Sequence, residues 1–252
     1  MSTIPFQPVP DVAATGRPQS GLNYYVARTL SEVIESWGVV YGSYLRDDLI
    51  DPNPFGIHTV PQAVGPNTAV TFGCLGPLPV SALSAYADGP AGLPLETVYH
   101  QQIQELRDAG RRLIEVGLFA DRREHLNRSA EGLFELMRFG HYFGAYMDAD
   151  DIVIGVHPRH APFYIRFFGC KQIGPVKTYP TVKDKAVVLL QFGIKDNPKL
   201  RPLPKGLAYF LENPVPSSLF DRRFRFDEPT LAGSPIAQFL AYRAAKAPPR
   251  AA

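Results

Sequence analysis

A single glutamate interrupts an apolar, strand-like run in this chain. Glu115 lies within RLIEVGLF, where an ionisable side chain is unexpected. Burial makes a carboxylate hold its proton more tightly, so partial burial would raise the pKa of Glu115 into the range useful for a general base. The alternative is a structural ion pair with Arg111, Arg112 or another arginine. If the strand alternates, Leu113, Glu115 and Gly117 share one face.

A second polar cluster lies in DIVIGVHPRHAPFYIRFFG. The apolar run Ile152–Val156 leads through His157 and His160 into an aromatic segment that contains Tyr164 and stops at Gly169. A strand that ends in polar residues and feeds a short helix places reactive groups at the edge of a sheet. Both histidines are candidates for proton relay or substrate contact, although a histidine beside a proline turn is more often structural.

Hydrophobic periodicity predicts the elements that position these residues. Strands are expected over Thr68–Leu75, Pro79–Asp88, Arg112–Phe119, Ile152–Val156 and Ala186–Ile194. Helices are expected over 22–45 (one or two), Leu95–Ala109, Ser129–Tyr146 with Ser129 as N-cap, Pro162–Phe168 and Pro235–Lys246. A turn at Gly76–Pro79 makes part of the sheet antiparallel, and the strand–helix–strand from Arg112 to Val156 makes part of it parallel. This order is typical of an α/β sandwich with a central mixed sheet.

The amino-acid composition is typical of a globular protein with a net charge close to zero. The 252 residues are 45% hydrophobic and 20% charged, with a net charge of +2, which gives no argument for nucleic-acid binding. The sequence shows no apolar run of the roughly 18 residues needed to span a bilayer and no signal peptide, so we expect a cytoplasmic protein. Cys74 and Cys170 are expected to be core thiols, and no metal site is predicted.

Three blocks of the sequence resemble one enzyme family. They are Ser43–His58, Gly89–His125 and Asp151–Gly174, and KAVVLLQF follows at the expected distance. Together these resemble the GNAT acyltransferase superfamily, and within it the N-acyl amino acid synthases of the FeeM type, relatives of the acyl-homoserine lactone synthases. The resemblance covers roughly residues 22–195. It predicts a GNAT-like three-layer α/β/α sandwich for that domain, after a flexible leader (1–21) and before a Pro-rich basic extension (196–252) packed on or flanking it.

The resemblance implies an N-acyltransferase that moves a long acyl chain from an acyl carrier protein to the α-amine of an amino acid. Acyl-phosphopantetheine would be the donor, with acyl-CoA as the alternative, and no cofactor would be bound permanently. Glu115 would be the base, and the lactone synthases also carry an acid at this position. Tyr164 would protonate the leaving thiolate. Oxyanion donors would come from the backbone of Gly117 and its neighbours Val116, Leu118 and Phe119.

The segment after the Glu115 strand departs from the CoA-binding pattern. ADRREHLNRSAEGLFELM lacks the glycine loop that cradles a CoA pyrophosphate at a helix N-terminus. A carrier-protein donor does not need that loop. Arg122, Arg123 and Arg128 could then meet the phosphopantetheine phosphate or an acidic carrier, or could form a solvated basic loop. Arg46 is a candidate for binding the amino acid carboxylate.

Two competing hypotheses remain at this point. One is a CoA-dependent GNAT N-acetyltransferase, against which the missing glycine loop argues. The other is a non-catalytic GNAT-fold module that binds acyl chains or carrier proteins, against which the presence of Glu115 and Tyr164 argues.

Overall fold

The computed structural model describes residues 21–122 and 131–246. The strands are β1 (Leu22–Val26), β2 (Thr68–Leu75), β3 (Leu78–Ala87), β4 (Leu113–Asp121), β5 (Asp151–Val156), β6 (Lys171–Gln172), β7 (Lys177–Tyr179) and β8 (Lys185–Gly193). The helices are α1 (Leu30–Arg46), α2 (Glu96–Asp108), α3 (Glu131–Tyr146), α4 (Ala161–Phe168), α5 (Lys205–Glu212), α6 (Ser218–Asp221), α7 (Glu228–Leu231) and α8 (Pro235–Lys246). Short 3-10 helices are η1 (Pro61–Val64), η2 (Pro158–His160), η3 (Pro180–Val182) and η4 (Asn197–Lys199).

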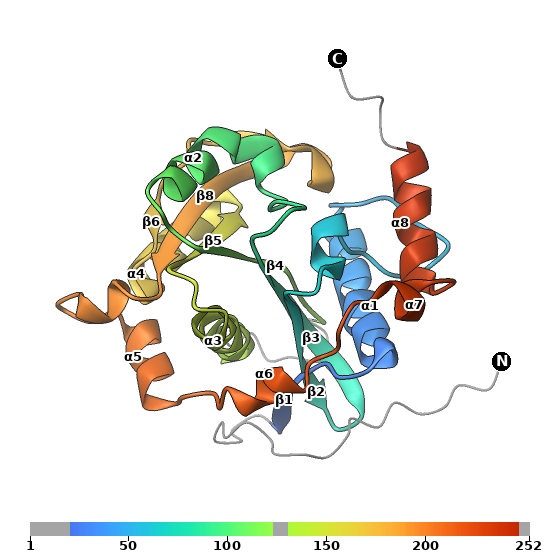
Figure 1. Cartoon of the computed structure of the whole chain (residues 1–252), viewed down its shortest axis with the longest axis horizontal. Coiled ribbons are helices and arrows are strands. Elements are labelled where there is room, and N and C mark those ends of the chain that lie inside the picture. The colour runs from blue at the N-terminus through green and yellow to red at the C-terminus, as the bar shows by residue number, and fades with distance from the viewer. Residues whose placement is uncertain (1–20, 123–130, 247–252) are drawn as a thin grey trace.

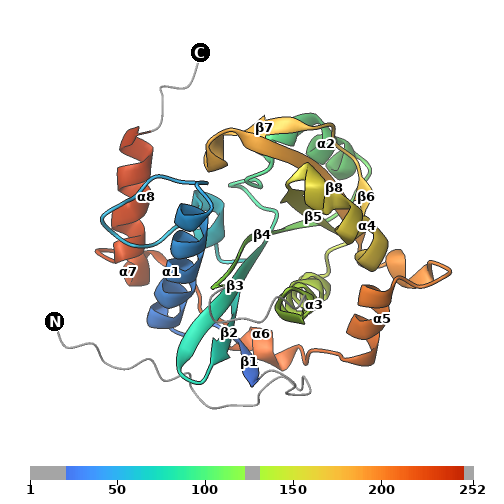
Figure 2. The same ribbon diagram turned by 180° about the vertical axis from the view of Figure 1, so that it is seen from behind.

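The strands form one eight-stranded sheet in the order β1-β2-β3-β4-β5-β8-β6, with β7 also paired to β8. Neighbouring strands are antiparallel except β4 and β5, which are parallel. Helices cover both faces of the sheet (Figures 1 and 2). The predicted α/β/α sandwich with a mixed sheet is therefore confirmed, including the β2–β3 hairpin and the parallel β4–β5 pair.

Each face of the sheet has its own apolar core. One core holds side chains of α3, α4, α5 and α6, and its buried phenylalanines include Phe139, Phe143, Phe168 and Phe210. The other core holds side chains of α1, α2 and α8, including the fully buried Trp37 and Tyr99. Cys74 and Cys170 are free and buried, as predicted. Among the described residues, every helix is too short or too polar to cross a bilayer.

The prediction of one or two helices over 22–45 is wrong at its start. Residues 22–26 form β1, which pairs with β2, because Tyr24 and Val26 alternate into the core as an added edge strand. A single helix, α1, then begins after Thr29. Thr29 and Glu32 form a capping box that ends the strand-like segment and starts the helix. The predicted start of α3 at Ser129 lies outside the described residues.

The central strand β4 contains a β-bulge just beyond Glu115. Ser84 of β3 pairs with Gly117 and Ala82 pairs with Ala120, so two residues of β4 lie opposite one of β3. Leu118, within this bulge, has a φ of 49°, a left-handed conformation rare for leucine. The bulge reverses the alternation of side chains, which places Leu118 on the same face as Glu115.

The two parallel strands separate at the same level. β4 pairs with β5 only from Leu113–Asp151 to Glu115–Val153. β5 itself continues in register with β8 as far as Val156. The C-terminal half of β4 therefore leaves β5, and Glu115 lies where the gap begins.

The segment after β8 wraps around the β1 edge of the sheet. α5 and α6 cover the face of α3, and the chain then runs past β1 and β2 to α7 and α8 beside α1 (Figure 1). Buried Arg223 holds this crossing, because its guanidinium donates to the carbonyls of Thr68 and Pro66. The backbone N–H of Phe224 donates to the carbonyl of Ala27 at 2.7 Å.

Candidate active site

Glu115 is a buried carboxylate held by two hydrogen bonds. Its side chain is 3% exposed. Oε2 accepts from the backbone N–H of Leu95, at the start of α2, at 3.0 Å, and Oε1 accepts from the Tyr86 hydroxyl at 3.2 Å. Burial raises the pKa of Glu115 to about 8, against the lowering effect of these two donors. Glu115 can thus exchange a proton near neutral pH.

The ion-pair alternative for Glu115 does not match the structure. Arg111 is paired with Asp151 at 2.6 Å and with Asp196 at 2.9 Å. Arg112 is paired with Asp148 and reaches Asp150. In the part of the chain that the structure describes, no Lys, Arg or His nitrogen lies within ion-pair distance of Glu115.

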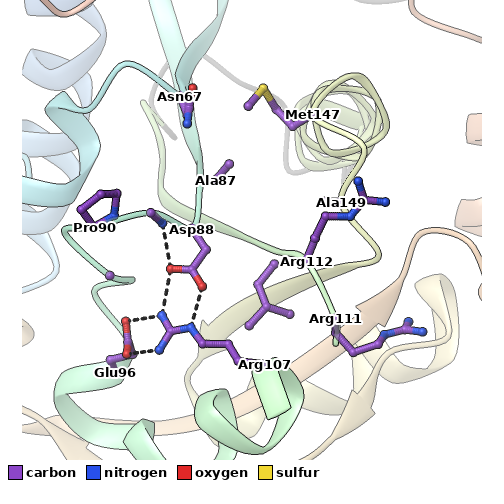
Figure 3. Close-up of a pocket in the computed structure, with 13 residues that line it drawn as sticks. Asn67, Ala87, Asp88, Pro90, Glu96, Arg107, Arg111, Arg112, Met147 and Ala149 are labelled. Atoms are coloured by element: carbon purple, nitrogen blue, oxygen red, sulfur yellow. Dashed lines mark hydrogen bonds and ion pairs between the residues drawn. The ribbon is translucent and has the colours of Figure 1, made fainter. Parts of the chain in front are cut away.

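Arg111 and Arg112 instead line an open pocket of about 600 Å³ (Figure 3). Arg107, in the same pocket, bridges Asp88 at 2.6 Å and Glu96 at 2.5 Å. All three arginines of the pocket are thus already paired with neighbouring carboxylates. The pocket is therefore lined by a network of structural ion pairs, which holds α2 and the start of β4 in place.

Gly117 shares a face with Glu115, as strand alternation predicted. A Cβ at Gly117 would lie 3.8 Å from Glu115 Oε1 and 2.8 Å from the Tyr86 hydroxyl. The missing side chain therefore leaves room for the phenol that holds Glu115. The other three predicted oxyanion residues lie around the bulge: Val116 and Leu118 are buried, and Phe119 is half-buried.

Three tyrosines surround the carboxylate, and we call Tyr44, Tyr86 and Tyr179 the tyrosine cluster. They come from α1, β3 and β7. Burial is the largest cause that raises the pKa of each phenol, and the nearby Glu115 charge adds to it. The pKa of Tyr44 rises to about 12, so its hydroxyl stays protonated at neutral pH. Tyr86 donates a hydrogen bond to Glu115, and Tyr44 and Tyr179 lie within electrostatic reach of it.

Tyr164 lies on α4, which ends at left-handed Gly169 as predicted. Its ring is half-buried and packs 5.9 Å from the Phe168 ring. Burial raises its pKa well above the usual range, and Cys170 and Tyr44 add to this. Tyr44 interacts electrostatically with both Glu115 and Tyr164, and the role of Tyr164 as the acid stays a prediction.

The predicted histidines lie at the surface. His157 and His160 are exposed, and Arg159 lies between them. His157 Nδ1 accepts from the Arg159 backbone N–H at 3.3 Å, and Arg159 Nε donates to His160 Nε2 at 3.1 Å. The structure therefore does not bring either imidazole to Glu115.

The predicted basic residues lie toward the far end of β4. Arg46 donates to the carbonyl of Asp121 and to Ser43 Oγ. Asp121 is six positions beyond Glu115, roughly 20 Å of strand. Arg122 follows and is half-buried, with its backbone N–H bound to the carbonyl of Val80. Arg123 and Arg128 lie outside the described residues.

Sequence reasoning missed several residues of this site. Tyr86 meets Glu115 only because β3 pairs with β4 in one register. Tyr44 stands in a block that carried the family resemblance, and its spacing to Glu115 gave no signal. Tyr179 arrives on a three-residue strand too short to recognise.

Comparisons with known proteins point to one enzyme family. A family model described as N-acyl amino acid synthase FeeM matches residues 35–192, more than half of the chain. The structure is similar to that of FeeM, an N-acyl amino acid synthase from uncultured soil microbes, with 22% identity, a TM-score of 0.62, and coverage of 75% of this chain and 97% of that one. No curated protein matches the chain.

Two lactone synthases share the fold. The CoA-dependent acyl-homoserine lactone synthase BjaI has 12% identity, a TM-score of 0.54, and coverage of 80% and 99%. The CoA-dependent acyl-homoserine lactone synthase MesI has 14% identity, a TM-score of 0.52, and coverage of 75% and 93%. The mixed sheet with separating central strands is GNAT-like, as the sequence predicted.

Proposed function

Because the chain belongs to the FeeM family of N-acyl amino acid synthases, we propose that it moves a long-chain acyl group from an acyl carrier protein thioester to the α-amine of an amino acid. Acyl transfer is the chemistry of this family. The observation that supports the proposal is the buried, cation-free Glu115 at the point where β4 leaves β5.

The reaction divides into proton transfer, attack and release. Deprotonated Glu115 takes a proton from the amino acid ammonium, and the neutral amine attacks the thioester carbonyl. The oxyanion forms at the bulge, where N–H groups of Val116 to Phe119 are the candidate donors. Collapse breaks the C–S bond, and Tyr164 protonates the departing thiolate. The second proton of the attacking nitrogen leaves through solvent and restores the phenol, while Glu115 returns its own proton to solvent. The products are the N-acyl amino acid and the free thiol of the carrier.

The Tyr86 hydroxyl and the Leu95 N–H orient the base. Both donate to the carboxylate of Glu115, so they fix its position and keep its pKa from rising further. A base with a pKa near 8 takes a proton from an ammonium group more readily than one at the ordinary value of glutamate.

The donor assignment is supported by the sequence that follows β4. That segment lacks the glycine loop for a CoA pyrophosphate and carries Arg122, Arg123 and Arg128 instead. BjaI and MesI are CoA-dependent, which makes acyl-CoA the alternative donor.

The test supplies three donors to the purified protein: palmitoyl carrier protein, palmitoyl-CoA and acetyl-CoA, each with a pool of amino acids. Mass spectrometry then identifies the N-acyl products. A long-chain product made from the carrier protein and not from palmitoyl-CoA supports the proposal. Product from acetyl-CoA alone identifies a CoA-dependent N-acetyltransferase, and binding of the acyl carrier without product identifies a non-catalytic module.

A further inference from the structure

The C-terminal helix α8 packs beside the candidate active site. It lies alongside α1 in both views (Figures 1 and 2). Phe239 of α8 is buried, and its ring centroid lies 6.3 Å from that of Phe55 and 6.1 Å from that of His58. The family match ends at residue 192, so α8 lies outside the matched segment.

Arg243 of α8 is a half-buried guanidinium without a carboxylate partner. Its Nη1 donates to the carbonyl of Thr59 at 2.6 Å. No Asp or Glu oxygen within residues 21–122 or 131–246 lies at ion-pair distance from it. A guanidinium has five N–H donors, and withdrawing its charge from water is costly unless an anion compensates it. Burial accordingly lowers the pKa of Arg243. The arrangement is that of an anion site.

Arg243 and Glu115 both influence the pKa of the Tyr179 hydroxyl. The pKa of Tyr179 is raised by Glu115 and lowered by Arg243, so this phenol lies within electrostatic reach of both. The His58 ring lies 5.2 Å from the ring of Tyr44, which also feels the charge of Glu115. The tyrosine cluster therefore links the surroundings of the Arg243 guanidinium to those of the Glu115 carboxylate.

Two buried polar atoms near Arg243 have no hydrogen-bond partner among the residues that the structure describes. They are His58 Nε2 and Thr59 Oγ1, in side chains that are 4% and 0% exposed. Burial, with Arg243 as the second cause, lowers the pKa of His58 to about 3, so the imidazole is neutral. Buried polar atoms are nearly always satisfied in folded proteins. Their missing partner and the missing counterion of Arg243 point to the same ligand.

Ion pairs join the segment between β7 and β8 to the loop that follows α1. Lys183, at the tip between β7 and β8, pairs with Asp48 at 2.7 Å and with Asp51 at 2.9 Å. These ion pairs join the tip that follows Tyr179 to the loop after α1.

We propose that Arg243 binds the α-carboxylate of the acceptor amino acid, with His58 and Thr59 beside it, while the ammonium group faces Glu115. This inference rests on the proposed function. A zwitterion placed in this way has each of its charges opposite its complement. Arg46, the carboxylate partner predicted from the sequence, lies instead beside Asp121 at the far end of β4.

The test compares the free acceptor amino acid with its primary amide, which keeps the amine and lacks the carboxylate. The Arg243→Met variant should lower kcat/KM for the amino acid roughly 30- to 300-fold, chiefly through KM. It should change kcat/KM for the amide less than about threefold, and KM for the acyl donor should stay constant. Arg243→Lys should recover part of the preference, since it keeps the charge and loses the planar fork.

Controls and a binding measurement separate this inference from the proposed function. Lys246→Met removes an exposed cation from the same helix and should leave both substrates unaffected. Calorimetry should show that wild-type protein binds the N-acyl amino acid better than the N-acyl amino amide, and that Arg243→Met removes the difference. Wild-type protein that makes no product contradicts the proposed reaction, whereas the binding data still decide on Arg243. The inference would be overturned if Arg243→Met lowered kcat/KM equally for the amino acid and its amide, or left the preference for the amino acid unchanged. Loss of that preference in Arg46→Met but not in Arg243→Met would also overturn it.

Discussion

Glu115 and Glu135 are both almost completely buried, yet they lie in cores on opposite faces of the sheet and have different partners. Their exposed fractions are 3% and 2%. Glu135, on α3, accepts from Arg138 Nη2 at 2.5 Å and from the Tyr209 hydroxyl. Glu115 accepts from a backbone N–H and a phenol only.

The two glutamates differ in whether a positively charged side chain pairs with them: Arg138 pairs with Glu135, and no such partner of Glu115 lies among the described residues. Arg138 is itself 0% exposed and also donates to the carbonyl of Asn213 at 2.7 Å. The ion pair of Glu135 with Arg138 therefore links α3 to α5. Without such a cation, Glu115 has a pKa raised by burial to about 8, and it can gain or lose a proton at working pH. A buried acid is structural when a cation neutralises it, and it is available for chemistry when none does.

The sharpest test of this contrast removes the charge of Glu115. Glu115→Gln keeps the shape and an acceptor for the Leu95 N–H, but it cannot take a proton. We expect acyl transfer to fall roughly 10²- to 10⁴-fold, while circular dichroism and urea unfolding show an intact fold. Turnover within about threefold of wild type would remove Glu115 as the base.

The matching change at Glu135 should affect stability. Glu135→Gln leaves Arg138 buried without a counterion, which costs roughly 3 kcal/mol of unfolding free energy. Urea denaturation measures this loss against Glu105→Gln, an exposed carboxylate of α2 that should change stability by less than about 0.5 kcal/mol. A stable Glu135→Gln protein would show that the two acids are not distinguished by their partners.

The pH dependence of stability tests Glu115 without any substrate. An unfolded chain releases the Glu115 proton near its ordinary pKa, and the folded protein releases it only near 8. Between these values the unfolded state binds fewer protons, so rising pH favours unfolding through this group. The advantage of Glu115→Gln over wild type should grow by roughly 1.4 kcal/mol for each pH unit from about 5 to 8. Urea denaturation at several pH values measures the unfolding free energy of both proteins. A difference between them that stays constant from about pH 5 to 8 would contradict the raised pKa.

The sequence predicted the sandwich because its strands and helices carry strong periodic patterns, and it predicted Glu115 because a charge within an apolar strand is conspicuous. It mistook residues 22–26 for helix, since pairing with β2 is a tertiary contact that local spacing does not show. It also placed His157 and His160 with Tyr164 because they are neighbours in the chain. The turn in η2 directs both imidazoles to the surface.

Residues that come to the site from distant elements were beyond sequence reasoning. The register of β3 on β4 decides that Tyr86 faces Glu115, and a one-residue shift would turn it to the other face. Arg243 reaches the site because the extension wraps around the sheet, and its weak helical pattern gives no sign of that path. Topology, in both cases, supplies what composition and spacing lack.

Tyr86→Phe gives the smallest and most specific test of how Glu115 differs from Glu135. The Tyr86 hydroxyl donates to the carboxylate and lowers the pKa of Glu115, so its loss should raise that pKa. Activity at pH 7 should fall about 2- to 10-fold, the equivalent of one hydrogen bond. The midpoint of the pH–rate profile, near 8 in wild type, should move upward. The acceptor amine titrates identically with both proteins, so the shift between the two profiles reports Glu115 alone, and superimposable profiles would show that another group limits the rate.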